Sequence, residues 1–177
     1  MKLRQFAFIA TLLTAASIAG SGVPPTGSIP NGRPAGSVEI IDLNGLRNIE
    51  FGATEDELTR RGILRTSLDA CGGPMLAGHD MVSPVFVEDK LVLLWVGDPM
   101  RTPEGITAGS PVDEVWDRYP EVSRLRAPQG TRRLDGLLAR SGDRAYLFLH
   151  DGRTVRKTIA GYADWARRLF DEGVGPC

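Results

Sequence analysis

The sequence has little cysteine and histidine and no excess of charge of either sign. Its 177 residues include two cysteines and two histidines, and 21 basic residues stand against 22 acidic ones. This leaves almost no material for a zinc site, and the charge balance argues against a nucleic-acid-binding arm or an acidic tail. A content of 42% hydrophobic and 24% charged residues is typical of one globular domain.

Catalytic motifs are also missing. The chain has no Gly-x-Ser-x-Gly elbow, phosphate-binding loop, dinucleotide fingerprint or EF-hand loop. His79 and His150, each followed by an aspartate, are the only histidines, and neighbouring side chains in sequence do not make a catalytic dyad. We therefore predict no catalytic, cofactor-binding or metal-binding residues and no enzymatic activity, with an exported hydrolase that uses His79 or His150 as an alternative.

The N-terminus has the pattern of a secretory signal peptide. Lys2 and Arg4 precede the apolar run Phe6–Ala19, which ends in small residues suited to cleavage. About 14 apolar residues are fewer than the roughly 20 that a spanning helix needs, which argues against the alternative of an uncleaved anchor. The prediction is a signal peptide over residues 1–19, no stable membrane span after cleavage, and a secreted or extracytoplasmic protein.

Glycine, proline and serine dominate residues 20–37, which predicts a disordered tether because such a segment cannot bury a core. A single folded domain is expected over residues 38–177, beginning with the apolar residues Val38, Ile40 and Ile41.

Two similar segments follow each other at a spacing of 57 residues. In the first, Thr54-x-x-Glu57 is a capping box, and in the second Ser110 is a candidate cap with Pro111 at the first helical position. Each segment predicts a turn, a short helix and a hairpin. The identical pairs are Ile49 with Ile106, Gly52 with Gly109, Asp56 with Asp113, Glu57 with Glu114 and Arg61 with Arg118.

The predicted helices differ in their apolar faces. In the second helix, Val112, Val115, Trp116 and Tyr119 recur at helical spacing before Pro120 ends it, so Trp116 is expected in the core. The first helix has mainly Leu58, with Gly62 as a left-handed terminator. A third helix over about 162–171 presents one apolar stripe that should pack across a sheet. The stripe is made of Tyr162, Trp165, Ala166, Leu169 and Phe170.

Strands are predicted on both sides of each hairpin turn. Leu91–Val96 and Ala145–Leu149 are apolar at nearly every position and are expected to be central, with Leu91, Leu93 and Trp95 on one face. If helices cover only one sheet face, the other exposes an apolar patch to a partner; the alternative is that loops or the C-terminal helix cover it. The candidate partner surface consists of Trp95, Phe148, Tyr146 and Leu93.

The repeated pattern Ile-x-x-Gly-[Ala/Ser]-[Thr/Pro]-x-Asp-Glu-[Leu/Val] resembles the turn-helix-hairpin unit of small outer-membrane-assembly lipoproteins of the SmpA/OmlA type. Its duplication over roughly residues 46–160 resembles the β-lactamase inhibitor protein family. The resemblance implies a helix-on-sheet fold and a non-enzymatic protein-binding role. No residue of that family's binding loops can be carried over, and this chain has two cysteines in all rather than a disulfide within each unit.

Together these patterns predict an α+β fold in which helices pack on one face of an antiparallel sheet. Two degenerate helix-hairpin units, at about 46–100 and 103–160, precede the C-terminal helix.

Cys71 and Cys177 are an even count in a chain predicted to be exported, so a disulfide between them is the expected state. A reactive thiol at Cys71, in its Cys-Gly-Gly loop, is the alternative.

The predicted function is an exported non-enzymatic protein-binding or envelope-associated module, with a protein as its partner, no nucleic acid and no cofactor. A narrower alternative is an inhibitor of a secreted or periplasmic enzyme, such as a β-lactamase. Basic residues gather in the second half and could face an acidic partner or an anionic polymer, although interleaved acids favour an ordinary solvated surface. They are Arg124, Arg126, Arg132, Arg133, Arg140, Arg144, Arg153, Arg156 and Lys157.

Overall fold

The computed structural model describes residues 38–66 and 73–173. The predicted signal peptide and tether, and both cysteines of the predicted disulfide, lie outside these ranges. In the described ranges no helix is long and apolar enough to cross a membrane.

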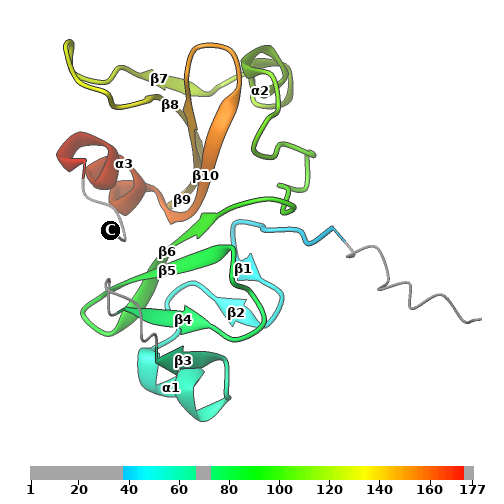
Figure 1. The fold of residues 1–177 in the computed structure, drawn as a ribbon, viewed down its shortest axis with the longest axis vertical. Helices are drawn as coiled ribbons and strands as arrows, with labels where there is room; N and C mark the ends of the chain where they lie inside the picture. The colour runs from blue at the N-terminus through cyan, green and yellow to red at the C-terminus, as the bar shows by residue number, and fades with distance from the viewer. Residues whose placement is uncertain (1–37, 67–72, 174–177) are drawn as a thin grey trace, which may run out of the picture. The chain divides into compact units, whose positions relative to one another are not determined.

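A six-stranded antiparallel sheet organises the domain (Figure 1). Its strand order is β5-β6-β10-β9-β8-β7, and two-stranded sheets β1-β2 and β3-β4 lie outside it. The apolar strands β6 and β9 each have a neighbour on both sides, which confirms that they are central. The main strands are β5 (Val82–Val87), β6 (Lys90–Val96), β7 (Ser123–Leu125), β8 (Asp135–Ser141), β9 (Arg144–His150) and β10 (Val155–Tyr162). The small sheets are made of β1 (Gly45–Leu46), β2 (Ile49–Glu50), β3 (Leu64–Thr66) and β4 (Pro74–Leu76).

The predicted α+β arrangement of two helix-hairpin units is wrong. The described chain is mostly β, and its helices α1 (Glu55–Arg60), α2 (Val112–Arg118) and α3 (Ala163–Glu172) have 6, 7 and 10 residues. Helices α1 and α2 fully bury only Leu58 and Val115, respectively, because their end signals stop them after about two turns. Two turns with one fully buried residue cover little of a sheet face, so α2 adds Val115 to the core beside β8 and β9, whereas α3 packs against β6, β8, β9 and β10.

The two predicted units also differ in the strands that their short helices precede. After α1 the chain makes the separate β3-β4 sheet before β5 and β6, whereas after α2 it makes four consecutive strands of the main sheet. Gly52 and Gly109 do share a positive φ, of 92° and 90°. The matching residues therefore specify a similar turn before each helix but not equivalent units.

Helix α1 begins and ends as the sequence predicts. Thr54 Oγ1 accepts a hydrogen bond from the Glu57 amide at 3.1 Å. At the other end, Gly62 has φ 69°, its amide donates to the Thr59 carbonyl and the Ile63 amide donates to Leu58. These two bonds form a Schellman motif, which closes the helix and brings Ile63 against Leu58.

Helix α2 lacks the predicted cap. Ser110 Oγ instead accepts from the Thr107 amide at 3.1 Å, and Pro111 precedes the first helical residue without a side-chain cap. The serine is occupied by the turn before the helix, so it cannot serve the helix amides.

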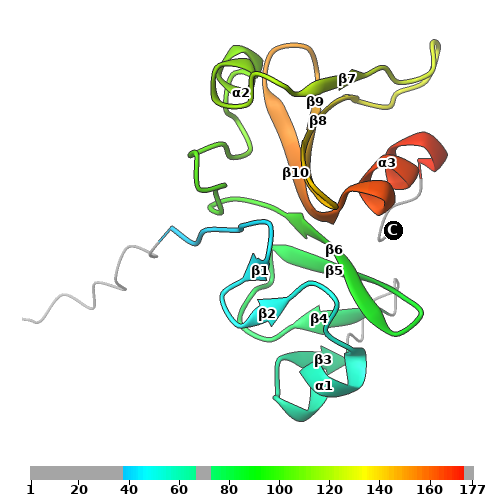
Figure 2. The ribbon, with the colours of Figure 1, turned by 180° about the vertical axis from the view of Figure 1, so that it is seen from behind.

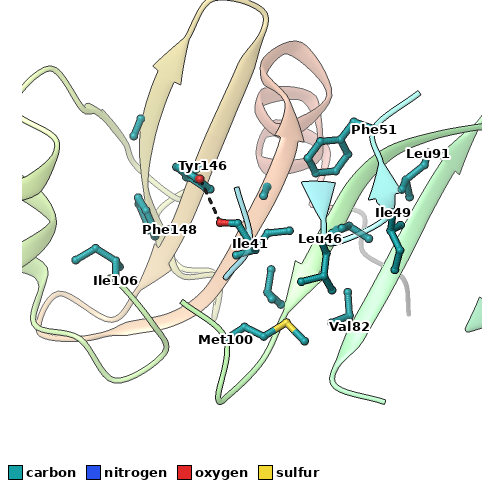
Figure 3. Close-up of a cluster of buried hydrophobic side chains, with 14 of the residues drawn as sticks. Ile41, Leu46, Ile49, Phe51, Val82, Leu91, Met100, Ile106, Tyr146 and Phe148 are labelled. Carbon is teal, nitrogen blue, oxygen red and sulfur yellow. Dashed lines mark hydrogen bonds between the residues drawn. The ribbon is translucent and has the colours of Figure 1, made fainter. Parts of the chain in front are cut away.

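Both faces of the main sheet are covered. On one face lie residues 38–51, the N-terminal cover, whose Ile41, Leu46 and Ile49 join the buried side chains of β5, β6 and β9 (Figure 3). Tyr146 donates a buried hydrogen bond of 3.2 Å to the Ile41 carbonyl. Both ribbon views show β1 and β2 beside β5 and β6 (Figure 2). The other face is covered by α3, the C-terminal helix that the sequence offered as an alternative cover.

A β-bulge interrupts the alternation of β6. Val85 pairs with Leu93 but Phe86 pairs with Leu91, which leaves Val92 as the extra residue. Leu91 therefore packs with the N-terminal cover, whereas Leu93 and Trp95 lie on the α3 face. The prediction that these three residues share a face is wrong at Leu91 because the sequence pattern does not show the bulge.

Gly161 of β10 faces this bulge in a close approach of two backbones. Its φ is +145°, and a Cβ at this position would lie 2.2 Å from the Val92 carbonyl oxygen. Only glycine fits there.

We predict that Gly161→Ala lowers the free energy of unfolding by at least about 3 kcal/mol, from backbone strain and the clash together. Gly142→Ala is the matched control, because Gly142 has φ +61° and no atom within 4 Å of an added Cβ. It should lose about 1–2 kcal/mol from strain alone. Urea unfolding of both variants measures the difference, and equal losses would contradict the close approach.

Candidate functional site

The four residues of the predicted partner surface do not form one surface. Leu93, Tyr146 and Phe148 are 1%, 2% and 0% exposed, and only Trp95 is partly exposed. Tyr146 and Phe148 lie on the face covered by the N-terminal cover and Tyr119, whereas Leu93 and Trp95 lie on the α3 face. Of the two alternatives that the sequence left open, the structure shows the covered one: α3 lies on one sheet face, and the N-terminal cover together with Tyr119 lies on the other.

Trp95 instead lines a cavity of about 270 Å³ beside α3. We call it the Trp95 pocket. Three of its large apolar residues, Trp95, Leu134 and Leu149, are incompletely buried. Strands β6 and β9, the segment before β8 and the end of α3 supply its lining, which consists of Trp95, Arg132, Arg133, Leu134, Leu149, Leu169, Phe170 and Gly173.

The pocket lining is positively charged. Arg133 lies with its guanidinium carbon 5.5 Å from the centre of the Phe170 ring and donates to the Asp171 carbonyl at 3.3 Å. Arg132 is exposed, and no described carboxylate lies within ion-pair distance of either arginine. The nearby acids of α3 are already paired, since Asp171 binds Arg167 at 2.8 Å and Glu172 binds Arg168 at 2.7 Å.

The pocket also has an unusual polar group in its wall. The indole Nε1 of Trp95 is buried and has no hydrogen-bond acceptor in the part of the chain that the structure describes. A buried donor without a partner costs about 1–3 kcal/mol. The ring is therefore held at this position by its packing and not by a polar contact.

His79 forms a carboxylate-imidazole pair. Its Nδ1 lies 2.9 Å from Glu39 Oε2, and Arg47 contacts the other oxygen of Glu39 at 2.7 Å. A carboxylate can orient a catalytic imidazole, but no described hydroxyl bonds to this ring. Through these contacts Glu39 connects the N-terminal cover to His79 in the loop before β5.

His150 is 6% exposed at the end of β9. Its Nδ1 accepts from the Gly152 amide at 3.1 Å, so the ring proton is assigned to Nε2, which has no described acceptor. Burial lowers the pKa of His150, and Arg124 acts in the same direction, against Asp135 and Asp151. The ring is a neutral core group.

Asp151, the acid beside His150, is committed to the β9-β10 loop. Its carboxylate accepts from the amides of Arg153 and Thr154, both at 2.9 Å, and from Arg156 at 2.7 Å. These bonds, the backbone ones first, hold the pKa of Asp151 well below its usual range. In the described contacts, His150 and Asp151 both accept hydrogen bonds from amides of the β9-β10 loop and so stabilise this turn.

A tyrosine cluster was not singled out by the sequence as a site. The Tyr119 hydroxyl donates to the Glu104 carboxylate and lies 2.9 Å from Thr102 Oγ1. The Tyr119 ring lies 5.8 Å from Tyr146 and 5.4 Å from Phe148 between centres. Burial, and then the bond to Glu104, raises the pKa of Tyr119, so its phenol keeps its proton and serves packing.

Within residues 38–66 and 73–173 no group of three or more histidine, cysteine or acidic side chains could hold a metal ion. Cys71 and Cys177 are not among these residues, so the disulfide stays a prediction. Family models, curated proteins and solved structures contain no match to this chain. The resemblance to the lipoprotein and inhibitor families therefore stays a prediction from the motif alone.

The lowered pKa of His150 predicts a pH-dependent stability. Below about pH 6.5 the unfolded chain takes up a proton that the folded ring resists, so the free energy of unfolding falls as the pH falls. The slope from this group is at most about 1.4 kcal/mol per pH unit. Urea unfolding between pH 5 and 7 should show the slope in the wild type and a smaller one in His150→Phe.

His79→Gln is the control for that measurement, because it removes the only other histidine. If the slope disappeared in His79→Gln and persisted in His150→Phe, the assignment to His150 would be wrong.

Proposed function

We propose that this chain is an exported, non-enzymatic protein-binding module whose binding surface is centred on the Trp95 pocket. The observation that carries the proposal is the partial exposure of Trp95, Leu134 and Leu149 around one cavity, in a domain whose two sheet faces are otherwise covered. Clustered apolar side chains in a concave surface are typical of interaction sites.

The state of the histidines supports a binding role over the hydrolase alternative. His79 bonds to Glu39, and His150 is 6% exposed, with its Nδ1 bonded to the Gly152 amide and its Nε2 buried. Neither histidine lines the Trp95 pocket. Export is part of the proposal on the strength of the N-terminal pattern of Lys2, Arg4 and the apolar run Phe6–Ala19.

Affinity capture tests the proposal. The chain from residue 20 to residue 177, purified under oxidising conditions, is immobilised and exposed to an extracytoplasmic extract, and the bound protein is identified, purified and titrated. We expect saturable binding that Leu134→Trp weakens at least tenfold, because a larger side chain occupies the cavity.

Met81→Trp is the matched control, since Met81 is an apolar residue, 56% exposed, that does not line the pocket. It introduces the same side chain elsewhere and should leave binding unchanged. If no protein binds, or if both tryptophan variants bind as the wild type does, the proposal is wrong. Binding lost with His79→Gln or His150→Phe but retained with Leu134→Trp would also contradict it.

A further inference from the structure

We infer that the Trp95 pocket receives one large apolar side chain from an acidic segment of its protein partner, with the acidic residues of that segment against Arg132 and Arg133. This inference rests on the proposed function and specifies the partner's chemistry.

The size of the cavity indicates a single side chain. At about 270 Å³ it is slightly smaller than the roughly 300–1,000 Å³ of sites that enclose a whole small molecule. Its hydrophobic wall is made of Trp95, Leu134, Leu149, Leu169 and Phe170. An aliphatic or aromatic side chain in this space gains its transfer free energy and brings no polar group of its own into the cavity, although the Trp95 indole N–H stays without an acceptor among the described residues.

The charge at the pocket indicates an acidic neighbourhood for that side chain. Two arginines and no carboxylate line the cavity. A basic segment would bring like charges together, whereas Asp or Glu beside the anchor would meet guanidinium groups that no described carboxylate neutralises.

A second groove beside α3 has no unpaired charge that would select an acidic partner. It is larger, about 480 Å³, but its charges are paired within the domain. Arg140 contacts Asp164 at 3.2 Å, and the remaining charged residues of this groove form the two α3 ion pairs at Asp171 and Glu172. A charged partner would have to break these pairs, so the observations favour the Trp95 pocket.

Arg133 is held in place before any partner binds. Its guanidinium lies over the Phe170 ring and against the end of α3, where a Cβ added at Gly173 would lie 2.9 Å from the guanidinium carbon. A fixed cation loses little side-chain entropy on binding, which favours recognition by this arginine.

Peptide titration against the chain purified under oxidising conditions tests the inference. The probes are nine-residue peptides with blocked ends: a central leucine flanked by Asp and Glu, the same peptide with serine in place of leucine, and two with asparagine and glutamine or with lysine in place of the acids. We expect the acidic leucine peptide to bind at least tenfold more tightly than the other three, with affinity falling as salt rises.

Matched variants assign the binding to the pocket. Arg132→Gln should weaken the acidic leucine peptide roughly three- to tenfold, since it removes one exposed charge of the site. Arg153→Gln is the control, because Arg153 is also exposed and without a described carboxylate partner but lies in the β9-β10 loop. Leu134→Trp should abolish binding, and circular dichroism checks that each variant is folded.

The outcomes separate this inference from the proposed function. Equal binding of the lysine peptide, no effect of salt, or no effect of Arg132→Gln would overturn the acidic partner. Failure of all four peptides, in a protein that still captures a partner in a manner blocked by Leu134→Trp, would overturn the inference and leave the proposed function standing. Failure of both capture and peptides would remove both.

Discussion

The pairing of β10 with β6 holds the main sheet together. Strands β5 and β6 form one local hairpin, and β7, β8 and β9 form another antiparallel group, but only β10 bonds to both groups. Its contact with β6 joins residues far apart in sequence, with Thr158 opposite Val96 and Ile159 opposite Trp95. The chain must close a long loop to make these bonds, so the pairing is favourable only with a large buried interface around it. The close approach at Gly161 is part of that interface.

Strands with apolar side chains on both faces then require two covers. The N-terminal cover brings Ile41, Leu46 and Ile49 to one face, and α3 brings Ala166 and Phe170 to the other. Helix α3 ends at Gly173, whose φ of 70° stops it after 10 residues. Among the described residues, a helix of this length does not cover the whole sheet face, and the Trp95 pocket lies beside its end. The proposed binding surface thus lies where helix α3 ends.

Local rules predicted the local elements. Thr54 marks the start of α1 and Gly62 follows its end. The apolar stripe specified α3, and the two runs of apolar residues were correctly placed as inner strands. The fold class was wrong because helix signals say where a helix starts and ends but not whether two turns can cover a sheet.

Long-range features account for the parts of the fold and site that the sequence did not reveal. The bulge at Val92 depends on which residues of β5 and β10 oppose it, and the pocket joins Trp95 with Arg133 and Leu149 from segments that share no motif. Trp95 was a candidate partner residue because its strand has apolar side chains on both faces. Leu149, Leu169 and Phe170 were predicted in a strand and a helix but not beside Trp95, and Arg132, Arg133 and Leu134 carry no signal beyond a basic pair and a leucine in a polar loop.

The Trp95 pocket is made of residues from both parts of the main sheet. Trp95 belongs to β6, whereas Leu149, Arg133 and Phe170 come from β9, the segment before β8 and α3. These two sets of residues meet only because β10 pairs with β6 on one side and β9 on the other. A chain in which β10 and β6 have separated has no Trp95 pocket, so a partner of the proposed kind would bind only the chain in which they are paired. Its binding free energy would then add to the stability of the same long-range pairing on which the sheet depends.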